Sequence, residues 1–158
     1  YTKLQSFQYK IIHRIIACNQ WLFRLKIHMS GLCSFCNCTD TIQHHFIYCQ
    51  KTLLFWEMFY NWWNSLDILR ISDIYIPEVL FGYPEQNKMI SVLNYILLIA
   101  KYHVYKQKLN NTHPFLPQML VELKNQLYVD EQISLKNKKK NNTYLEFADK
   151  YDIVIQAL

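Results

Sequence analysis

Four residues with metal-binding side chains lie close together in the first third of the chain. Cys33, Cys36, His44 and Cys49 follow the pattern C-x2-C-x7-H-x4-C, which offers three thiolates and one imidazole. Ligands of these types at this spacing are typical of a single tetrahedral Zn²⁺. Protein atoms would fill all four positions, so no position is left for a reactive water. The pattern therefore predicts one structural zinc ion and favours a binding module over a catalyst.

The spacing leaves the identity of one ligand open. His45 and Cys49 are four residues apart and share a face of a regular helix, whereas His44 and Cys49 are five apart. A separation of five fits only where a helix begins or loosens, so His44 and His45 both remain candidates on geometry. Cys38 is a spare thiol that could replace Cys36. The competing interpretation is a group of buried core thiols beside two histidines at a helix start.

The residues before the cysteines predict two helices. Apolar side chains recur at helical spacing over residues 3–16, which predicts an amphipathic helix. Its core-facing positions are Leu4, Phe7, Ile11 and Ile15. Asn19 can cap a second, shorter helix that extends to His28, and Ser30-Gly31 is suited to end it. Cys18 stands alone at the end of the apolar positions, and we assign it to the core.

The residues after the cysteines predict further helices. One helix should run from His44 to about Asn64, with Trp56 and Trp63 among its apolar residues and Trp62 about 100° away. Residues 65–87 are irregular and could include one short strand near Ile74–Ile76. Helices are predicted over residues 88–109 and 117–135, and Pro117 suits a first helical turn. A basic linker at residues 136–142 precedes a last predicted helix over residues 144–157.

Composition places the chain in the mostly α class, with little or no β structure around the CCHC site. Hydrophobic residues make up 51% of the chain and there are only two Gly, which is few for a fold with many strands. We divide the chain into N-terminal helices (1–30), the zinc segment with its following helix (31–66), a helical C-terminal part of the same domain (67–135), and the linker with the terminal helix (136–158). Because the first residue is Tyr1 and not Met, we expect a fragment of a longer protein.

The five cysteines and the apolar runs bear on the cellular setting. An odd number of cysteines clustered beside histidines favours metal and a reducing compartment over a disulfide framework. The longest nearly continuous apolar run, residues 89–100, is far shorter than the roughly 20 residues that span a bilayer. No signal-peptide pattern is present at the start of the sequence. We therefore expect an intracellular protein with no membrane partner.

Basic and aromatic residues indicate where nucleic acid could bind. Residues 1–50 carry five Lys/Arg against one Asp. One predicted helical stripe is basic and consists of Lys3, Lys10 and Arg14. A second combines basic and aromatic residues, namely Lys101, Tyr105 and Lys108, and the aromatic Phe35 lies between the first two cysteines. Cations contact phosphates and aromatic faces stack on unpaired bases. The competing interpretation is that the charges are solvated and the aromatic rings belong to the core.

The order of these segments resembles a known family. The quoted segments are Leu4-Gln5-Ser6-Phe7, Leu32-Cys33-Ser34-Phe35-Cys36, Thr41-Ile42-Gln43-His44, Cys49 and Phe55-Trp56. Together they resemble the zinc-binding domain at the C-terminal end of reverse transcriptases of non-LTR (LINE-type) retrotransposons, over roughly residues 3–135. The resemblance implies His44 as the third ligand. Two residues depart from the family pattern, because Gln43 replaces an acid and His45 replaces a leucine.

The resemblance implies a parent RNA-directed DNA polymerase in nuclear and cytoplasmic ribonucleoproteins. Its catalytic domains would lie before Tyr1, since the chain has no adjacent Asp pair of the polymerase type. We therefore expect no enzyme activity and no small-molecule substrate here, but an accessory domain that binds RNA or DNA and contacts the polymerase domains. The alternative is a zinc-braced module that docks on the polymerase or another protein without touching nucleic acid.

Overall fold

The computed structural model of this chain describes residues 2–71, 76–84, 87–136, 151–152 and 154–156. These residues are mostly helical and contain no strand, as the composition predicts. The elements in chain order are α1 (Thr2–Ile12), α2 (Asn19–Arg24), the π-helical turn η1 (His44–Tyr48), α3 (Gln50–Ser65), α4 (Ile76–Phe81), α5 (Lys88–Leu109) and α6 (Leu116–Lys136). One isolated antiparallel bridge joins Leu32 and Thr39 within the described residues.

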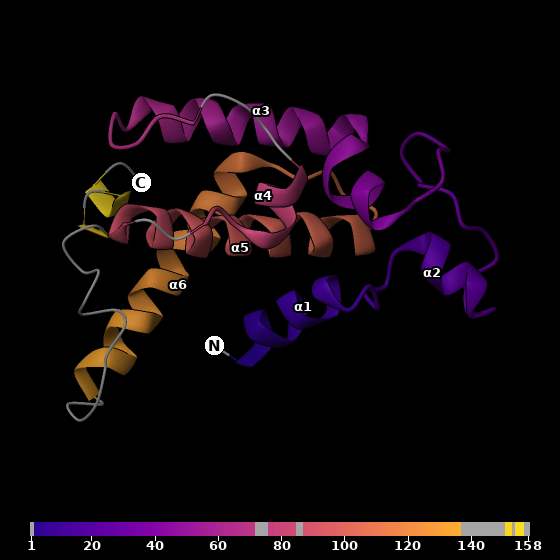
Figure 1. The fold of residues 1–158 in the computed structure, drawn as a ribbon, viewed down its shortest axis with the longest axis horizontal. Helices are drawn as coiled ribbons and strands as arrows, with labels where there is room; N and C mark the ends of the chain where they lie inside the picture. Colours follow the sequence, from indigo (N-terminus) through magenta and orange to yellow (C-terminus); the bar gives the residue numbers. More distant parts are fainter. Residues whose placement is uncertain (1, 72–75, 85–86, 137–150, 153, 157–158) are drawn as a thin grey trace.

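The long helices α3 and α5 extend along the long axis of the molecule (Figure 1). At one end of this axis lies α2, and the described residues after position 150 lie near the other end. A hydrophobic core forms where α1, η1, α3, α5 and α6 meet, and it includes Tyr151 and Val154. The largest fully buried side chains are Trp56 and Trp63, whereas Trp62 is only partly buried. Two of the three tryptophans of α3 are therefore core residues.

The N-terminal helices are shorter than their sequence patterns predict. Leu4, Phe7 and Ile11 are buried as expected, but α1 ends at Ile12 and Ile15 is exposed. Arg14 has a φ of 57°, a left-handed conformation that a helix cannot contain. The second helix ends at Arg24 instead of His28, and its cap residue is Cys18.

The later helices agree well with the sequence pattern. Helix α5 has the predicted bounds, because the Asn87 side chain accepts a hydrogen bond from the Ile90 backbone N–H (3.0 Å) and caps its start. Helix α6 spans the predicted region, with Pro117 in its first turn. In the irregular region, Ile76 begins a short helix and not a strand, while 72–75 lie outside the described residues. Most of the predicted linker and terminal helix also lies outside them, although 151–152 and 154–156 are helical.

Candidate metal centre

The first two cysteines lie in a tight turn, residues 33–39, which we call the cysteine turn. The Leu32–Thr39 bridge closes it at the base. Inside the turn, the Cys33 N–H donates to the Cys38 carbonyl (2.8 Å), and the Asn37 N–H donates to the Cys33 carbonyl (2.9 Å). Asn37 has a φ of 59°, a left-handed conformation that asparagine tolerates better than most residues. Local backbone geometry therefore brings the two thiols together.

The third and fourth candidate ligands come from a break between two helical segments. The π-helical turn His44–Tyr48 ends with a hydrogen bond from the Cys49 N–H to the His44 carbonyl (3.0 Å). Cys49 itself is extended and α3 begins at the next residue, so the single helix predicted from His44 to Asn64 is wrong. The extra residue in a π turn brings positions five apart onto one side. This is the loosened helix that a His44–Cys49 pair requires.

The four ligand atoms converge on one point. The Sγ atoms of Cys33, Cys36 and Cys49 and an imidazole nitrogen of His44 all lie within 4.8 Å of one another. The two Sγ atoms of Cys33 and Cys49 are 3.8 Å apart, and His44 Nε2 is 3.2 Å from the Cys36 Sγ. A tetrahedral zinc with Zn–S of about 2.3 Å and Zn–N of about 2.05 Å separates two sulfurs by about 3.8 Å and a sulfur from a nitrogen by about 3.6 Å. The cluster could therefore hold a metal ion. The Cys33–Cys49 distance equals the value for zinc, whereas the Cys36–His44 distance is shorter than the value for zinc.

The protein environment shifts the pKa values of the Cys33 and Cys49 thiols in opposite directions. Burial raises the pKa of Cys33 to about 11, although the Phe35 backbone N–H, which bonds the sulfur, opposes the shift. Burial also acts to raise the pKa of Cys49, but the Lys108 charge and the Lys51 and Thr52 backbone N–H groups outweigh it, so that pKa is lowered. A metal would displace the remaining thiol protons.

The neighbouring histidine lies in a different set of contacts. His45 is 3% exposed, and its Nδ1 donates to the Asp40 carboxylate at 3.0 Å. The Asp40 carboxylate also accepts from the Asn19 backbone N–H (2.9 Å) and lies 3.3 Å from the Lys108 Nζ. Burial alone would raise the pKa of Asp40, but the hydrogen bond from His45 and the Lys108 charge hold it well below its usual range. His45 therefore supports the segment, and the ligand cluster contains His44.

The remaining cysteines lie outside the cluster. Cys38 is exposed at the end of the cysteine turn and does not belong to the group of converging ligand atoms. Cys18 is buried, as the sequence indicates, where it precedes α2. No cysteine among the described residues forms a disulfide.

The second basic stripe predicted to face nucleic acid faces the protein interior instead. Lys101 is 3% exposed, and its Nζ donates to the Gln8 side-chain oxygen (2.7 Å) and the Leu80 carbonyl (2.8 Å). Lys108 is also buried, between Asp40 and the His45 carbonyl. The Tyr105 ring packs 5.4 Å from the Phe7 ring, centroid to centroid. The prediction for this stripe is wrong because α5 is enclosed by other elements over much of its surface.

The other predicted contact residues lie at the surface. Lys3 and Lys10 are exposed on α1, and the Lys3 Nζ lies 5.3 Å from the centre of the Tyr102 ring. Arg14 is exposed but lies beyond the end of α1, so the first stripe is not one continuous helical face. Phe35 is partly exposed, and its ring centre lies 4.8 Å from that of His113.

Comparisons with known proteins were made at the level of families, single proteins and solved structures. None of the three found a match to this chain. The comparisons therefore neither support nor oppose the resemblance to retrotransposon reverse transcriptases. Among the described helices, none combines the length and apolar character that crossing a membrane requires.

Sequence reasoning gave Lys108 a different role. The structure buries it beside Asp40, where its charge acts to lower the pKa values of Cys33, Cys49 and His44. No local pattern could have shown this, because Lys108 is 68 positions from its partner Asp40. Arg24, which the predicted contact residues do not include, lies exposed at the end of α2, and residues 1–39 contain no acid.

Proposed function

We propose that this chain is a nucleic-acid-binding accessory domain built around one structural Zn²⁺. It holds template RNA or target DNA for the polymerase of a non-LTR retrotransposon, within a nuclear and cytoplasmic ribonucleoprotein. The order of segments that resembles the C-terminal zinc domain of those reverse transcriptases supports this proposal. The four converging ligands support the zinc, with Cys33, Cys36, His44 and Cys49 filling its coordination sphere.

The distribution of charge on the surface carries the nucleic-acid part of the proposal. Asp40 is the only acid in residues 1–50, and it is 1% exposed. All five Lys/Arg of the same segment are exposed; they are Lys3, Lys10, Arg14, Arg24 and Lys26. The surface formed by this segment therefore displays positive charge with no carboxylate to compensate it. Such a surface attracts polyanions through the release of their condensed counterions.

A protein-docking module without nucleic-acid contact is the second candidate. It is favoured by the segment after α2, where Ile27 is 70% exposed and Met29 is 95% exposed. Exposed apolar side chains that form a contiguous patch are typical of contact surfaces. Trp56 and Trp63 are buried and so do not contribute to such a surface.

Fluorescence anisotropy of a labelled single-stranded RNA, measured with the zinc-loaded chain at rising salt, separates the two candidates. The proposal predicts binding at micromolar or lower concentration that weakens steeply with salt. It also predicts loss of binding in Cys36→Ser, whereas Cys38→Ser, which changes an exposed thiol outside the cluster, should bind like the wild type. A folded, zinc-containing sample that binds no RNA or DNA at low salt would leave docking as the better account.

A further inference from the structure

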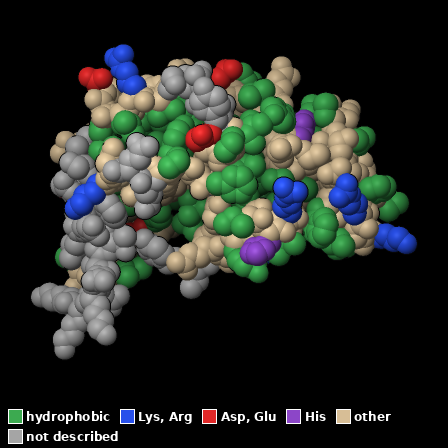
Figure 2. Space-filling model, viewed as in Figure 1, with side chains coloured by type: hydrophobic (Ala, Val, Ile, Leu, Met, Phe, Trp, Pro, Cys, Tyr) green, Lys and Arg blue, Asp and Glu red, His purple; other side chains and the backbone are tan. Residues whose placement is uncertain are grey.

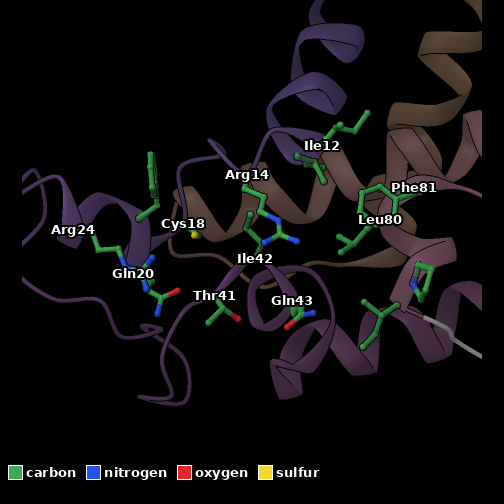
Figure 3. Close-up of a pocket in the computed structure, with 14 residues that line it drawn as sticks. Ile12, Arg14, Cys18, Gln20, Arg24, Thr41, Ile42, Gln43, Leu80 and Phe81 are labelled. Atoms are coloured by element: carbon green, nitrogen blue, oxygen red, sulfur yellow. The ribbon is translucent and has the colours of Figure 1, made fainter.

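A groove of about 560 Å³ lies next to the metal centre. Its walls come from the end of α1, from α2, from residues 41–43 just before η1, and from α4. Figure 3 shows Arg24 and Gln20 toward one end of the groove, Leu80 and Phe81 toward the other, and the Arg14 side chain extending between them toward Ile42 and Gln43. Segments that are distant in sequence thus enclose one hollow.

The charge of the groove has a single sign. Arg14 and Arg24 line it, and none of the described residues that line it is acidic. On the face drawn in Figure 2, basic side chains appear over the end of the molecule that carries α2. The acidic side chains visible on this face lie over other parts of the molecule. The two arginines are therefore available for anionic groups without competition from a neighbouring carboxylate in the groove.

The uncharged lining of the groove supplies other kinds of contact. Trp21, Ile42 and Phe81 offer aromatic and apolar surface, and Phe81 is 61% exposed. Gln20 and Gln43 offer amide groups, which can donate and accept hydrogen bonds. A ligand that matches this lining carries negative charge, a flat ring, and polar edges around the ring. A nucleotide with an unstacked base has all three properties.

We propose that this groove binds single-stranded nucleic acid, with Arg14 and Arg24 at the phosphates and Trp21 against a base. The inference rests on the proposed nucleic-acid function and adds to it the place of binding and the form of the strand. A duplex does not suit the groove, because its bases are paired and stacked and cannot enter a hollow of this size. Pockets of about 300–1,000 Å³ accommodate ligands of drug-like size, which corresponds here to a nucleotide or two.

The groove and the metal centre share structural supports. Residues 41–43, which form one wall, lead directly into the candidate ligand His44. A second wall, α2, is joined to the metal segment because Asp40 accepts hydrogen bonds from the Asn19 N–H through its carboxylate (2.9 Å) and from the Gln20 N–H through its carbonyl (3.3 Å). Metal binding would therefore fix the width of the groove.

The test compares two double variants that each remove two positive charges. Arg14→Ala with Arg24→Ala changes the groove, and Arg70→Ala with Lys124→Ala changes two exposed residues that do not line it. The probe is a fluorescein-labelled oligouridine of 12 nucleotides, and a blunt duplex of equal length is the second probe. Zinc content and circular dichroism establish that every variant is folded. All measurements use the zinc-loaded full chain.

The expected result is a loss of oligouridine affinity of about tenfold or more in the groove variant and less than about threefold in the matched control. The slope of log K against log salt should fall by about 0.7 for each arginine that contacts a phosphate. Trp21→Leu should weaken oligouridine binding by about fivefold or more without changing that slope, since stacking carries no charge. The duplex should bind more weakly than oligouridine and should not respond to Trp21→Leu.

Two results would overturn the inference while leaving the proposed function intact. One is an equal loss of affinity in both double variants, which would mean that overall charge decides binding. The other is a duplex that binds as tightly as the single strand, with no effect of Trp21→Leu on either probe. A wild-type chain that is folded and zinc-loaded but binds neither probe would instead refute the proposed function, and the groove inference with it.

Discussion

At the scale of single residues, the adjacent histidines have separate roles. The imidazole of His44 lies in the ligand cluster, whereas that of His45 bonds Asp40. We expect His44→Ala to lower zinc affinity by more than about 100-fold, which exceeds the usual cost of losing a supporting contact. We expect His45→Ala to keep one zinc per chain but to lower the free energy of unfolding by about 2–3 kcal/mol, because the buried Asp40 loses a donor.

Competition with a chelator and urea unfolding measure these two effects. The matched pair is informative because the two variants differ by one position in the chain and delete the same side chain. A zinc affinity that falls strongly in His45→Ala and little in His44→Ala would contradict the assignment of the ligand.

We expect Lys108 to strengthen zinc binding, although no hydrogen bond joins its side chain to a ligand side chain. Three thiolates and one imidazole around Zn²⁺ carry a net charge of about −1, and the Lys108 charge acts on two of those thiolates. We expect Lys108→Met to weaken zinc binding by about tenfold, in the range typical of supporting residues. Lys124→Met, on the exposed side of α6, is the control and should leave zinc affinity unchanged. Equal zinc affinity in the two variants would show that Lys108 serves only the fold.

At the scale of elements, Lys101 joins three helices. It extends from α5 to Gln8 on α1 and to the Leu80 carbonyl on α4, and the Gln8 amide donates to the same carbonyl (2.9 Å). Burial lowers the pKa of Lys101 to about 7, below its ordinary 10.5. The folded state therefore binds fewer protons than the unfolded state between these two values, so this residue makes stability rise with pH there.

The pH dependence gives a direct prediction for Lys101→Met. Between pH 7 and pH 9, the free energy of unfolding of the wild type should rise relative to that of Lys101→Met by about 2 kcal/mol. Titration of the thiols cancels in this difference because both chains share the metal site. Urea unfolding at a series of pH values measures it, with Lys124→Met as the exposed control. A difference that stays constant with pH would mean that Lys101 is not charged differently in the two states.

The elements also show where sequence reasoning succeeds. The ends of α5 could be predicted because Asn87 and the Asn110-Asn111 pair are local signals. The break at Cys49 could not be predicted, because helix-forming residues continue through it. Only the placement of His44 and Cys49 in one ligand cluster favours a π turn there. The stripe of Lys101, Tyr105 and Lys108 misled for a related reason. A basic stripe on a helix has the same periodicity whether it faces solvent or, as here, buried acceptors.

At the scale of the whole molecule, the metal segment and the helical core meet at η1, where Phe46 and Ile47 are core residues, but most of the core lies outside residues 33–49. The core draws its buried side chains mainly from α1, α3, α5 and α6, whereas the ligands lie within residues 33–49. Removal of zinc by a chelator should therefore abolish hydrogen-exchange protection of the Cys33, Asn37 and Cys49 amides and leave that of α5 largely intact. Loss of protection throughout the chain would show instead that the metal holds the entire fold.

The four ligands could be predicted from the sequence because they lie close together in the chain. The groove could not be predicted in this way. Arg14, Trp21, Ile42 and Phe81 come from four segments whose proximity depends on tertiary packing. The acid-free composition of residues 1–39 signals a basic surface but gives no indication of a hollow in it. Function at this level is therefore visible only once the helices have been placed.

The most direct test of the metal centre is X-ray absorption at the zinc edge of the purified chain. The account predicts one zinc per chain with three sulfur ligands at about 2.3 Å and one nitrogen at about 2.05 Å, unchanged in Cys38→Ser. Chains that bind no zinc, or zinc with an oxygen ligand in place of one of these four, would contradict a closed structural site.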